Sequence, residues 1–447
     1  MQKQHFINAM LITAIVIALT SATARTVQAE QAATPRTDIA PPMYKKLLIV
    51  DLDPVLPTRD GKKLQEYTRT RPTKEAVVDY VARLKEASHG ILNYEVTYET
   101  LNEFPRHKNG FRVDAEKFPD HWEAAHAQPT GGWWTYPYFD DIGKTGFQFD
   151  YEHYIKEWNL VERVNKGEVD EVWFFAEFAG AYETVMVGKG AYWINGIGIE
   201  ADCKPFRINS IAKHRTDTPL ENLGHSAESI LRKIYKSDEM RRSRRGTEMT
   251  TWDRFAAYDK VLPEKAVAGN VHFAPNSQND YDWGNKEKVW SAWRDWRDNY
   301  PHLKGEKELV DTTVWGNGDN LAHKTWWFSC FPHFIGRDEK GYSHNWWEYY
   351  QNFVHTAKLE ITLDGKPVDG AFAVEKGKTY DIKVFATLTD RSRIDVTNDC
   401  IIVIGKDGND KPYFAIDTEA QKLTGLISTT AAKLTVWRDG VVAGVVL

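Results

Sequence analysis

The first third of the chain alternates between short apolar runs and one long amphipathic segment. Leu47 to Leu52 is an apolar run, and Ile91 to Leu101 alternates apolar with polar positions, so both ranges predict strands. Thr73 to Ala87 repeats its apolar residues at helical spacing and stops at His89-Gly90. Strand, helix and strand in this order usually form a parallel pair with a right-handed crossover.

The same order of elements returns further along the chain. Asp150 to Asn165 predicts a helix, and Glu171 to Ala176 is a continuous apolar run of the kind buried on both faces of a sheet. Phe206 to Ala212 and Ala266 to Ala274 predict further strands. Together these elements predict an α/β main domain with a mostly parallel sheet over residues 44–350.

The helix predicted from Thr218 to Tyr235 has the best-defined start. Thr218 takes the N-cap position, Pro219 the first helical position and Glu221 the third, which together form a capping box. The apolar residues of this helix share one stripe, which we expect to be buried: Leu220, Leu223, Ala227, Ile230, Leu231 and Ile234.

The C-terminal region, residues 356–447, has a different pattern. Short alternating or β-branched stretches are separated by turn pairs such as Asp364-Gly365 and Asp439-Gly440. This spacing predicts an all-β sandwich. The strand stretches are Lys358 to Leu363, Thr379 to Leu388, Cys400 to Ile404, Tyr413 to Ile416 and Lys433 to Arg438.

One part of this region carries a family resemblance. Glu375 to Val384, followed by Ala386-Thr387-Leu388 and Asp395-Val396-Thr397, resembles the bacterial immunoglobulin-like modules of secreted proteins. The resemblance implies an immunoglobulin-like sandwich that serves as a spacer or binding accessory. It implies nothing about catalytic chemistry.

The N-terminus has the pattern of a cleaved signal peptide over residues 1–29. Lys3 precedes the uncharged apolar run from Phe6 to Thr20, and Val27-Gln28-Ala29 offers small residues for cleavage after Ala29. Residues 30–43 read as a proline-containing linker. We therefore expect a secreted, periplasmic or cell-surface protein with no membrane span after processing.

Net charge limits the expected binding partners, and the cysteine count limits the expected disulfide bonds. The chain has 57 basic and 63 acidic residues, a net charge of −6, which repels nucleic acid. Cys203, Cys330 and Cys400 are too few for a disulfide framework. At most one bridge is expected, with Cys203 and Cys330 as the favoured pair.

Tryptophan is unusually dense, since nine of the 17 tryptophans lie between residues 283 and 347. Flat indole faces suit half-exposed surfaces that hold sugars, so an extracellular polysaccharide or glycoconjugate is the expected partner. The helical spacing of Trp290, Trp293, Trp296 and Tyr300 favours a buried stripe instead. The pairs Trp326-Trp327 and Trp346-Trp347 support a core less and leave a surface open, since neighbours in sequence point in different directions. The candidate substrate-binding residues are Trp193, Asn195, Asn270, Asn276, Trp283 and Trp326.

The predicted helix at residues 218–235 carries the first candidate site. His225 and Glu228 are three residues apart on one face, so they could bind one metal ion or act as an acid–base pair. Glu221 to His225 resembles the zincin helix but has Glu221 in place of the first histidine ligand and Asn222 in place of the catalytic glutamate. The alternative is structural: Glu221 completes the capping box and Glu228 pairs with Arg232.

His272 supplies a further candidate ligand or acid–base group. It lies on the strand predicted for Ala266 to Ala274, where the chain runs into Pro275-Asn276, at the sheet edge that binds ligands in α/β proteins. A core histidine with satisfied hydrogen bonds is the alternative. Asn279 to Gly284 has the oxygen density of a calcium loop, so the metal to consider is zinc or calcium.

The third candidate site follows the buried strand. Glu177 and Glu183 lie beside glycines and aromatic residues, and two carboxylates are what glycoside hydrolysis requires. Three classes stay open: a secreted hydrolase acting on a glycan through paired carboxylates, a metal-dependent peptidase or amidase, and a non-enzymatic glycan-binding or adhesion protein. The candidate catalytic residues are Glu183, His225, Glu228 and His272, of which the last three are also the candidate metal ligands.

Overall fold

The computed structural model divides the chain into two compact units, Met1–Ile39 and Ala40–Leu447. The residues that the structure describes are 38–126, 149–177, 179–214, 218–237 and 249–444. The predicted signal peptide at 1–29 lies outside these residues, as does most of the predicted linker at 30–43.

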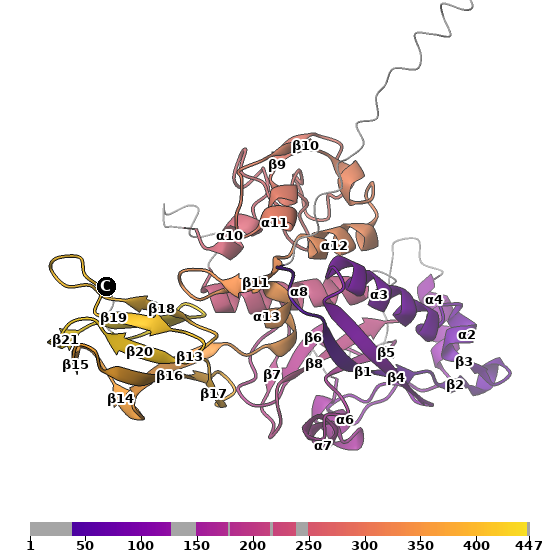
Figure 1. The fold of residues 1–447 in the computed structure, drawn as a ribbon. Coiled ribbons are helices and arrows are strands. Elements are labelled where there is room, and N and C mark those ends of the chain that lie inside the picture. The colour runs from indigo at the N-terminus through magenta and orange to yellow at the C-terminus, as the bar shows by residue number, and fades with distance from the viewer. Residues whose placement is uncertain (1–37, 127–148, 178, 215–217, 238–248, 445–447) are drawn as a thin grey trace, which may run out of the picture. The chain divides into compact units, whose positions relative to one another are not determined.

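A six-stranded mixed sheet forms the centre of the N-terminal part, in the order β4-β1-β5-β8-β6-β7 (Figure 1). Its strands are β1 (Met43–Leu52), β4 (Leu92–Leu101), β5 (Glu171–Ala176), β6 (Thr184–Val187), β7 (Gly198–Ile199) and β8 (Phe206–Ala212). Strands β4, β1, β5 and β8 are mutually parallel, and β6 joins β8 antiparallel. The predicted α/β class and the parallel pairing of the first two strands are confirmed.

Helices cover both faces of this sheet (Figure 1). One face carries α3 (Thr73–Ala87) and α8 (Thr218–Tyr235), and the other carries α6 (Tyr151–Glu157) and α7 (Leu160–Asn165). The single helix predicted for residues 150–165 is two helices, because Asn159 adopts the left-handed conformation at φ 51° between them. Strand β5 is buried along its whole length, as its sequence predicts.

The strand predicted for Ala266 to Ala274 is wrong, because this segment is an irregular loop. Gly269 has φ +70°, and Asn270 turns its side-chain oxygen onto the backbone N–H groups of His272 and Phe273, each at 3.0 Å. Such local side-chain-to-backbone bonds compete with the strand pairing that the apolar residues suggested.

The tryptophan-rich segment builds an aromatic core. Of its nine tryptophans, Trp290 is 51% exposed and the other eight are buried, so the pairs Trp326-Trp327 and Trp346-Trp347 lie in the core and not on a surface. The predicted helical stripe is right for Trp293, Trp296 and Tyr300, whereas Trp290 lies on a strand. The elements here are α10 (Thr251–Phe255), β9 (Val289–Ser291), α11 (Trp293–Asn299), β10 (Glu308–Val310), α12 (Asn320–Ser329), β11 (His333–Arg337), β12 (Ser343–Asn345) and α13 (Trp346–Asn352).

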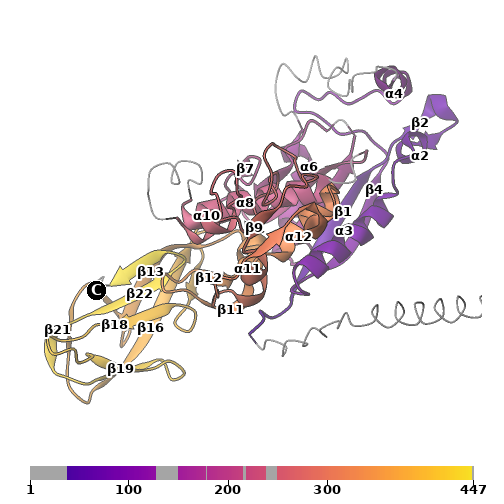
Figure 2. The same cartoon turned by 90° about the horizontal axis from the view of Figure 1, so that it is seen from above.

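The remaining elements of the N-terminal part are short. Helix α12 packs against α3 and α8, which places the aromatic core next to the sheet's helical layer (Figure 2). The short elements are β2 (Val55–Leu56), β3 (Lys62–Lys63), α2 (Leu64–Thr68) and α4 (Phe118–His126), with 3₁₀ turns at Pro57–Arg59 and Thr312–Trp315.

The C-terminal region is rich in antiparallel strands, and its arrangement is consistent with a sandwich. All five predicted strand stretches are present, and the inward-facing residues of β13, β16 and β22 share one apolar core. The strands are β13 (Thr356–Leu363), β14 (Lys366–Val368), β15 (Phe372–Val374), β16 (Thr379–Leu388), β17 (Arg393–Asp395), β18 (Ile401–Ile404), β19 (Phe414–Asp417), β20 (Lys422–Gly425), β21 (Thr429–Ala432), β22 (Leu434–Arg438) and β23 (Val441–Gly444).

A buried carboxylate ties this region to the residues before it. Asp439, in the turn between β22 and β23, is 2% exposed. It accepts hydrogen bonds from Tyr349 Oη at 2.7 Å, from Thr356 Oγ1 at 2.7 Å and from Arg337 Nη1 at 3.1 Å. Arg438 adds a further ion pair at 2.8 Å. These bonds hold the last hairpin against α13 and β11.

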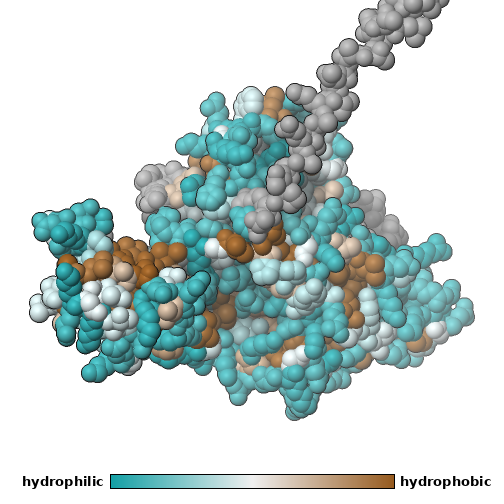
Figure 3. All heavy atoms as spheres, in the orientation of Figure 1, coloured by the Kyte–Doolittle hydropathy of each residue, from teal (hydrophilic) through white to brown (hydrophobic). Residues whose placement is uncertain are grey.

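The three cysteines are not joined to one another. Cys203, Cys330 and Cys400 are all free, so the expected bridge between Cys203 and Cys330 is wrong; each of these two is buried among apolar side chains. On the face drawn in Figure 3, hydrophilic residues predominate and apolar patches lie over the C-terminal strands. Among the described residues, no helix has the length and apolar character needed to cross a membrane.

Candidate functional site

Helix α8 presents the centre of the candidate site. Its apolar stripe is fully buried against β8, α12 and α13, as predicted, which fixes the rotation of the helix. Glu221, His225 and Glu228 therefore project together from a neighbouring face. Glu221 is 5% exposed, so its carboxylate faces the protein interior.

A glycine on α8 lets a loop approach this face. A Cβ on Gly224 would lie 2.6 Å from Val271 Cγ2, a separation that real side chains do not adopt. Val271 is also bound through its backbone N–H, which donates to Glu228 Oε1 at 3.0 Å. The close approach places the next residue, His272, edge-to-face with His225 at a ring-centroid distance of 4.7 Å.

Each imidazole is held by a carboxylate at Nδ1. His225 Nδ1 lies 3.1 Å from Glu228 Oε2, and His272 Nδ1 lies 2.9 Å from Asp280 Oδ1. In histidines that bind metals, such a bond holds the proton on Nδ1 and turns the Nε2 lone pair to the metal. His272 Nε2 in turn lies 3.6 Å from Glu221 Oε1.

Glu221, His225 and His272 form the compact group at the centre. One ligand atom from each of the three lies within 4.8 Å of the other two. Burial raises the pKa of Glu221, but the hydrogen bond from His272 and the charge of Lys324 outweigh it, so the pKa falls to about 2. Burial lowers the pKa of His225, and the bond and charge of Glu228 reverse this, so the pKa is raised overall.

Tyr281 closes the open side of the group. Its hydroxyl lies 2.9 Å from Glu221 Oε1 and 2.9 Å from His272 Nε2, and its side chain is 47% exposed. Its backbone has φ 59°, a strained value for a bulky residue and one that recurs at functional sites. Burial and the charge of Glu221 raise the pKa of Tyr281, so the phenol keeps its proton.

The surroundings of this group are rich in carboxylates. Glu183 raises the pKa of His225 and of Tyr281 through its charge, which places it near both. Asn195 Nδ2 donates a hydrogen bond to Glu183 Oε2. The charges acting on the group are those of Glu183, Glu221, Glu228 and Asp280 on the negative side and of Lys324 on the positive side.

Buried Lys324 supports Glu221 from α12. Its Nζ donates to Asn320 Oδ1 at 2.7 Å and lies 3.7 Å from the ring centroid of Trp283. Asn320 Nδ2 donates in turn to Glu221 Oε2 at 3.4 Å. Trp283, a predicted substrate-binding residue, is 6% exposed and acts here as a wall for the lysine.

Several predicted residues lie outside this group. Glu177 is buried and accepts bonds from the N–H and Nδ1 of His214, the latter at 2.7 Å. Asn276 is buried and donates to the backbone oxygens of Asn285 and Glu287. Asn270 turns the loop before His272, and Trp326 is buried in the aromatic core.

The structure also adds residues that the sequence did not single out. Asp280, Tyr281 and Asn320 contact the central group, and Lys324 acts on Glu221 through its charge. The sequence signal for Asp280 and Tyr281 is the oxygen-rich stretch from Asn279 to Gly284, which resembles a calcium loop. The helical spacing of Asn320 and Lys324 does not predict that both act on Glu221.

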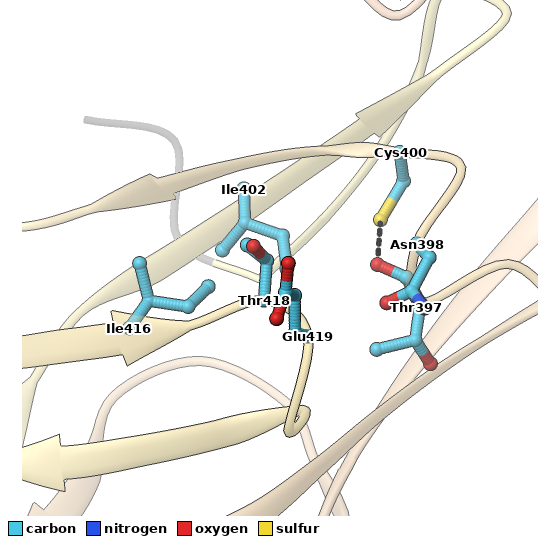
Figure 4. A pocket seen from close by; sticks show the side chains of 7 residues that line it. All are labelled: Thr397, Asn398, Cys400, Ile402, Ile416, Thr418 and Glu419. Carbon is cyan, nitrogen blue, oxygen red and sulfur yellow. Dashed lines mark hydrogen bonds between the residues drawn. The ribbon is translucent and has the colours of Figure 1, made fainter.

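A separate hollow lies in the C-terminal region (Figure 4). It encloses about 470 Å³, and its lining consists of Thr397, Asn398, Cys400, Ile402, Ile416, Thr418 and Glu419. Cys400 Sγ points to Thr397 O at 3.6 Å, and burial raises the pKa of this thiol to about 12. The thiol is therefore protonated at neutral pH, and the hollow lacks the imidazoles and paired carboxylates of the central group.

Comparison with known proteins gives no match. No protein-family description fits the chain, and no curated protein or solved structure is similar to it.

Proposed function

We propose that this chain is a metal-dependent hydrolase that holds a zinc ion between Glu221, His225 and His272. The observation that carries the proposal is the paired support of the two imidazoles. Each imidazole has Nδ1 beside a carboxylate, Glu228 for His225 and Asp280 for His272, and one ligand atom of each histidine lies within 4.8 Å of a carboxylate oxygen of Glu221. Histidines that bind metals almost always have such a partner on the other ring nitrogen.

The ligand set favours zinc over calcium. Two imidazole nitrogens and one carboxylate oxygen, with a fourth position left for water or substrate, are the set typical of catalytic zinc. Calcium takes six to eight oxygen ligands, which two imidazoles do not supply. The surrounding carboxylates of Glu183, Glu228 and Asp280 add the negative charge that a divalent cation balances.

The residues of the chain have separate tasks in this proposal. The metal would supply Lewis-acid activation of water and of a carbonyl oxygen. Glu183, held by Asn195, would take the proton of the attacking water and return it to the leaving group. Tyr281, which keeps its proton, would donate a hydrogen bond to the developing oxyanion. Its hydroxyl bridges Glu221 and His272 in the structure, so we expect the exposed side chain to swing aside when the cation binds.

Three further parts of the proposal concern the whole chain. Export remains a proposal, with a mature N-terminus at Glu30 that mass spectrometry of the secreted protein would test. The C-terminal sandwich is proposed to be immunoglobulin-like. Glycan hydrolysis through the carboxylates alone is not favoured, because Glu177 is occupied by His214.

Metal titration of the purified protein is the direct test. We expect one zinc ion per chain by calorimetry and elemental analysis, and loss of binding in Glu221→Ala and His225→Ala. His302→Ala is the matched control, since His302 is an exposed histidine outside the group. Absence of stoichiometric metal from the wild type would overturn the metal site. Metal binding without chelator-sensitive hydrolysis of ester, amide and glycan probes would overturn the hydrolase.

A further inference from the structure

We propose that Trp193 is a stacking platform for a pyranose ring, so that the substrate of the site is a saccharide or a saccharide-bearing molecule. This assignment deepens the proposed function and rests on it for the chemistry next to the platform. Trp193 is 55% exposed, although it lies in the loop between β6 and β7 directly before the buried Ile194. An exposed indole forgoes the free energy that burial of a large apolar side chain provides.

Contacts on both sides of Trp193 fix the loop, so its packing holds the indole in the exposed position. The next residue, Ile194, is fully buried, and its carbonyl accepts a hydrogen bond from Thr184 Oγ1. A Cβ on Gly196 would lie 2.2 Å from Thr184 O and 2.6 Å from Tyr182 Cβ, so only glycine fits there. Tyr182 also packs against the indole edge-to-face, with ring centroids 5.6 Å apart.

Polar groups lie beside this aromatic surface. Asn195, two residues after Trp193, has φ 79° and turns its amide onto the carboxylate of Glu183. A pyranose ring has an apolar face of C–H groups and a rim of hydroxyls. It is therefore matched by a flat aromatic face in a loop that also carries an amide, bound to the carboxylate of Glu183, and the oxygens of both groups can accept hydrogen bonds from sugar hydroxyls.

The same carboxylate connects the platform to the proposed metal site. Glu183 acts electrostatically on His225 and on Tyr281, and Tyr281 is itself 47% exposed. The exposed rings of Trp193 and Tyr281 thus belong to the surroundings of one glutamate. This shared glutamate is the link between the platform and the proposed zinc ligands.

The chain contains its own control. Trp290 on β9 is 51% exposed, nearly as much as Trp193, and its strand partner across the β9–β10 ladder is the apolar Leu309. If exposure of an indole were enough for sugar binding, Trp290 would bind as Trp193 does. If the neighbouring amide and carboxylate are needed, only Trp193 will contribute.

The test measures binding of soluble tetrasaccharides to the full-length mature protein by calorimetry. The probes are β-1,4-linked glucose, β-1,4-linked N-acetylglucosamine and α-1,4-linked glucose. We expect one of them to bind, Trp193→Ala to weaken that binding at least about tenfold, and Trp290→Ala to leave it unchanged. Trp193→Phe, which keeps a smaller ring, should recover part of the affinity and guards against a folding defect.

The outcomes separate this assignment from the proposed function. Zinc titration of the same variants is run in parallel, and Trp193→Ala should bind zinc as the wild type does. Zinc binding with no binding of any tetrasaccharide overturns the saccharide assignment and leaves the metal site standing. Equal loss of sugar binding in Trp193→Ala and Trp290→Ala also overturns it. Sugar binding that needs Trp193 in a protein that takes up no zinc supports the platform and overturns the metal site.

Discussion

Replacement of Gly224 by alanine tests how the loop at Val271 and His272 is positioned. The new Cβ would lie 2.6 Å from Val271 Cγ2, whereas ordinary van der Waals contact begins at 3.4 Å, so Val271 must move by about 0.8 Å. Metal sites tolerate ligand displacements of only about 0.2 Å. We therefore expect Gly224→Ala to weaken zinc binding at least about tenfold, comparable to the loss of an outer-shell partner.

Two opposing contributions decide how Gly224→Ala changes the free energy of unfolding. Alanine in place of glycine inside a helix stabilises it by about 1 kcal/mol, whereas overpacking of a full core costs about 1–3 kcal/mol. The free energy of unfolding without metal should thus be unchanged or reduced by up to about 2 kcal/mol. Urea unfolding in the presence of a chelator measures this change.

Two further variants decide the cause. Gly224→Ala with Val271→Ala removes the clashing methyl group and should restore part of the zinc affinity. Gly408→Ala, where a Cβ meets no atom within 4 Å, is the control for a harmless glycine substitution. Wild-type zinc affinity in Gly224→Ala, together with a gain in stability of about 1 kcal/mol, would refute the proposed role of this glycine.

Three shorter predictions concern other buried groups. Glu228→Gln should weaken zinc binding by about 10–100-fold in competition with a chelator, and unchanged affinity would contradict its role at His225 Nδ1. Burial lowers the pKa of His355 from 6.5 to about 4, so the wild type should lose up to about 3 kcal/mol of stability as the pH falls through this window. His355→Gln should remove that loss. If the stability of the wild type and of His355→Gln falls in parallel from pH 7 to pH 4, this role of His355 is contradicted. Asp439→Ala should cost about 3–5 kcal/mol in urea unfolding, because Arg337 and Arg438 lose their buried partner, and a change below about 1 kcal/mol would contradict this.

The sequence predicted the regular elements well because their information is periodic. The apolar stripe of α8 and the continuous run of β5 follow directly from spacing, and both have the predicted bounds. The same periodicity placed His225 and Glu228 on one helix face. It could not say which glutamate turns toward the site, because Glu221 and Glu228 are both within one turn of His225.

The remaining site residues could not be predicted, because contacts between distant segments place them. His272 was recognised for its chemistry but assigned to a strand, whereas an asparagine turn and the gap at Gly224 position it. The position of the Tyr281 side chain depends on a left-handed backbone conformation, which the neighbouring residues do not predict. Tryptophan density alone does not separate a core from a surface, because indoles serve both, and only burial distinguishes the two.

The carboxylate of Asp439 bears on how this chain can be shortened or recombined. A cut before β13 at Thr356 would remove Asp439 and leave Arg337 and Tyr349 without the acceptor they share. The next residue must be glycine, because a Cβ on Gly440 would lie 2.1 Å from Tyr342 Oη. The C-terminal β-rich region therefore cannot be exchanged freely, and a replacement would need an acid and a glycine at the matching turn to fit.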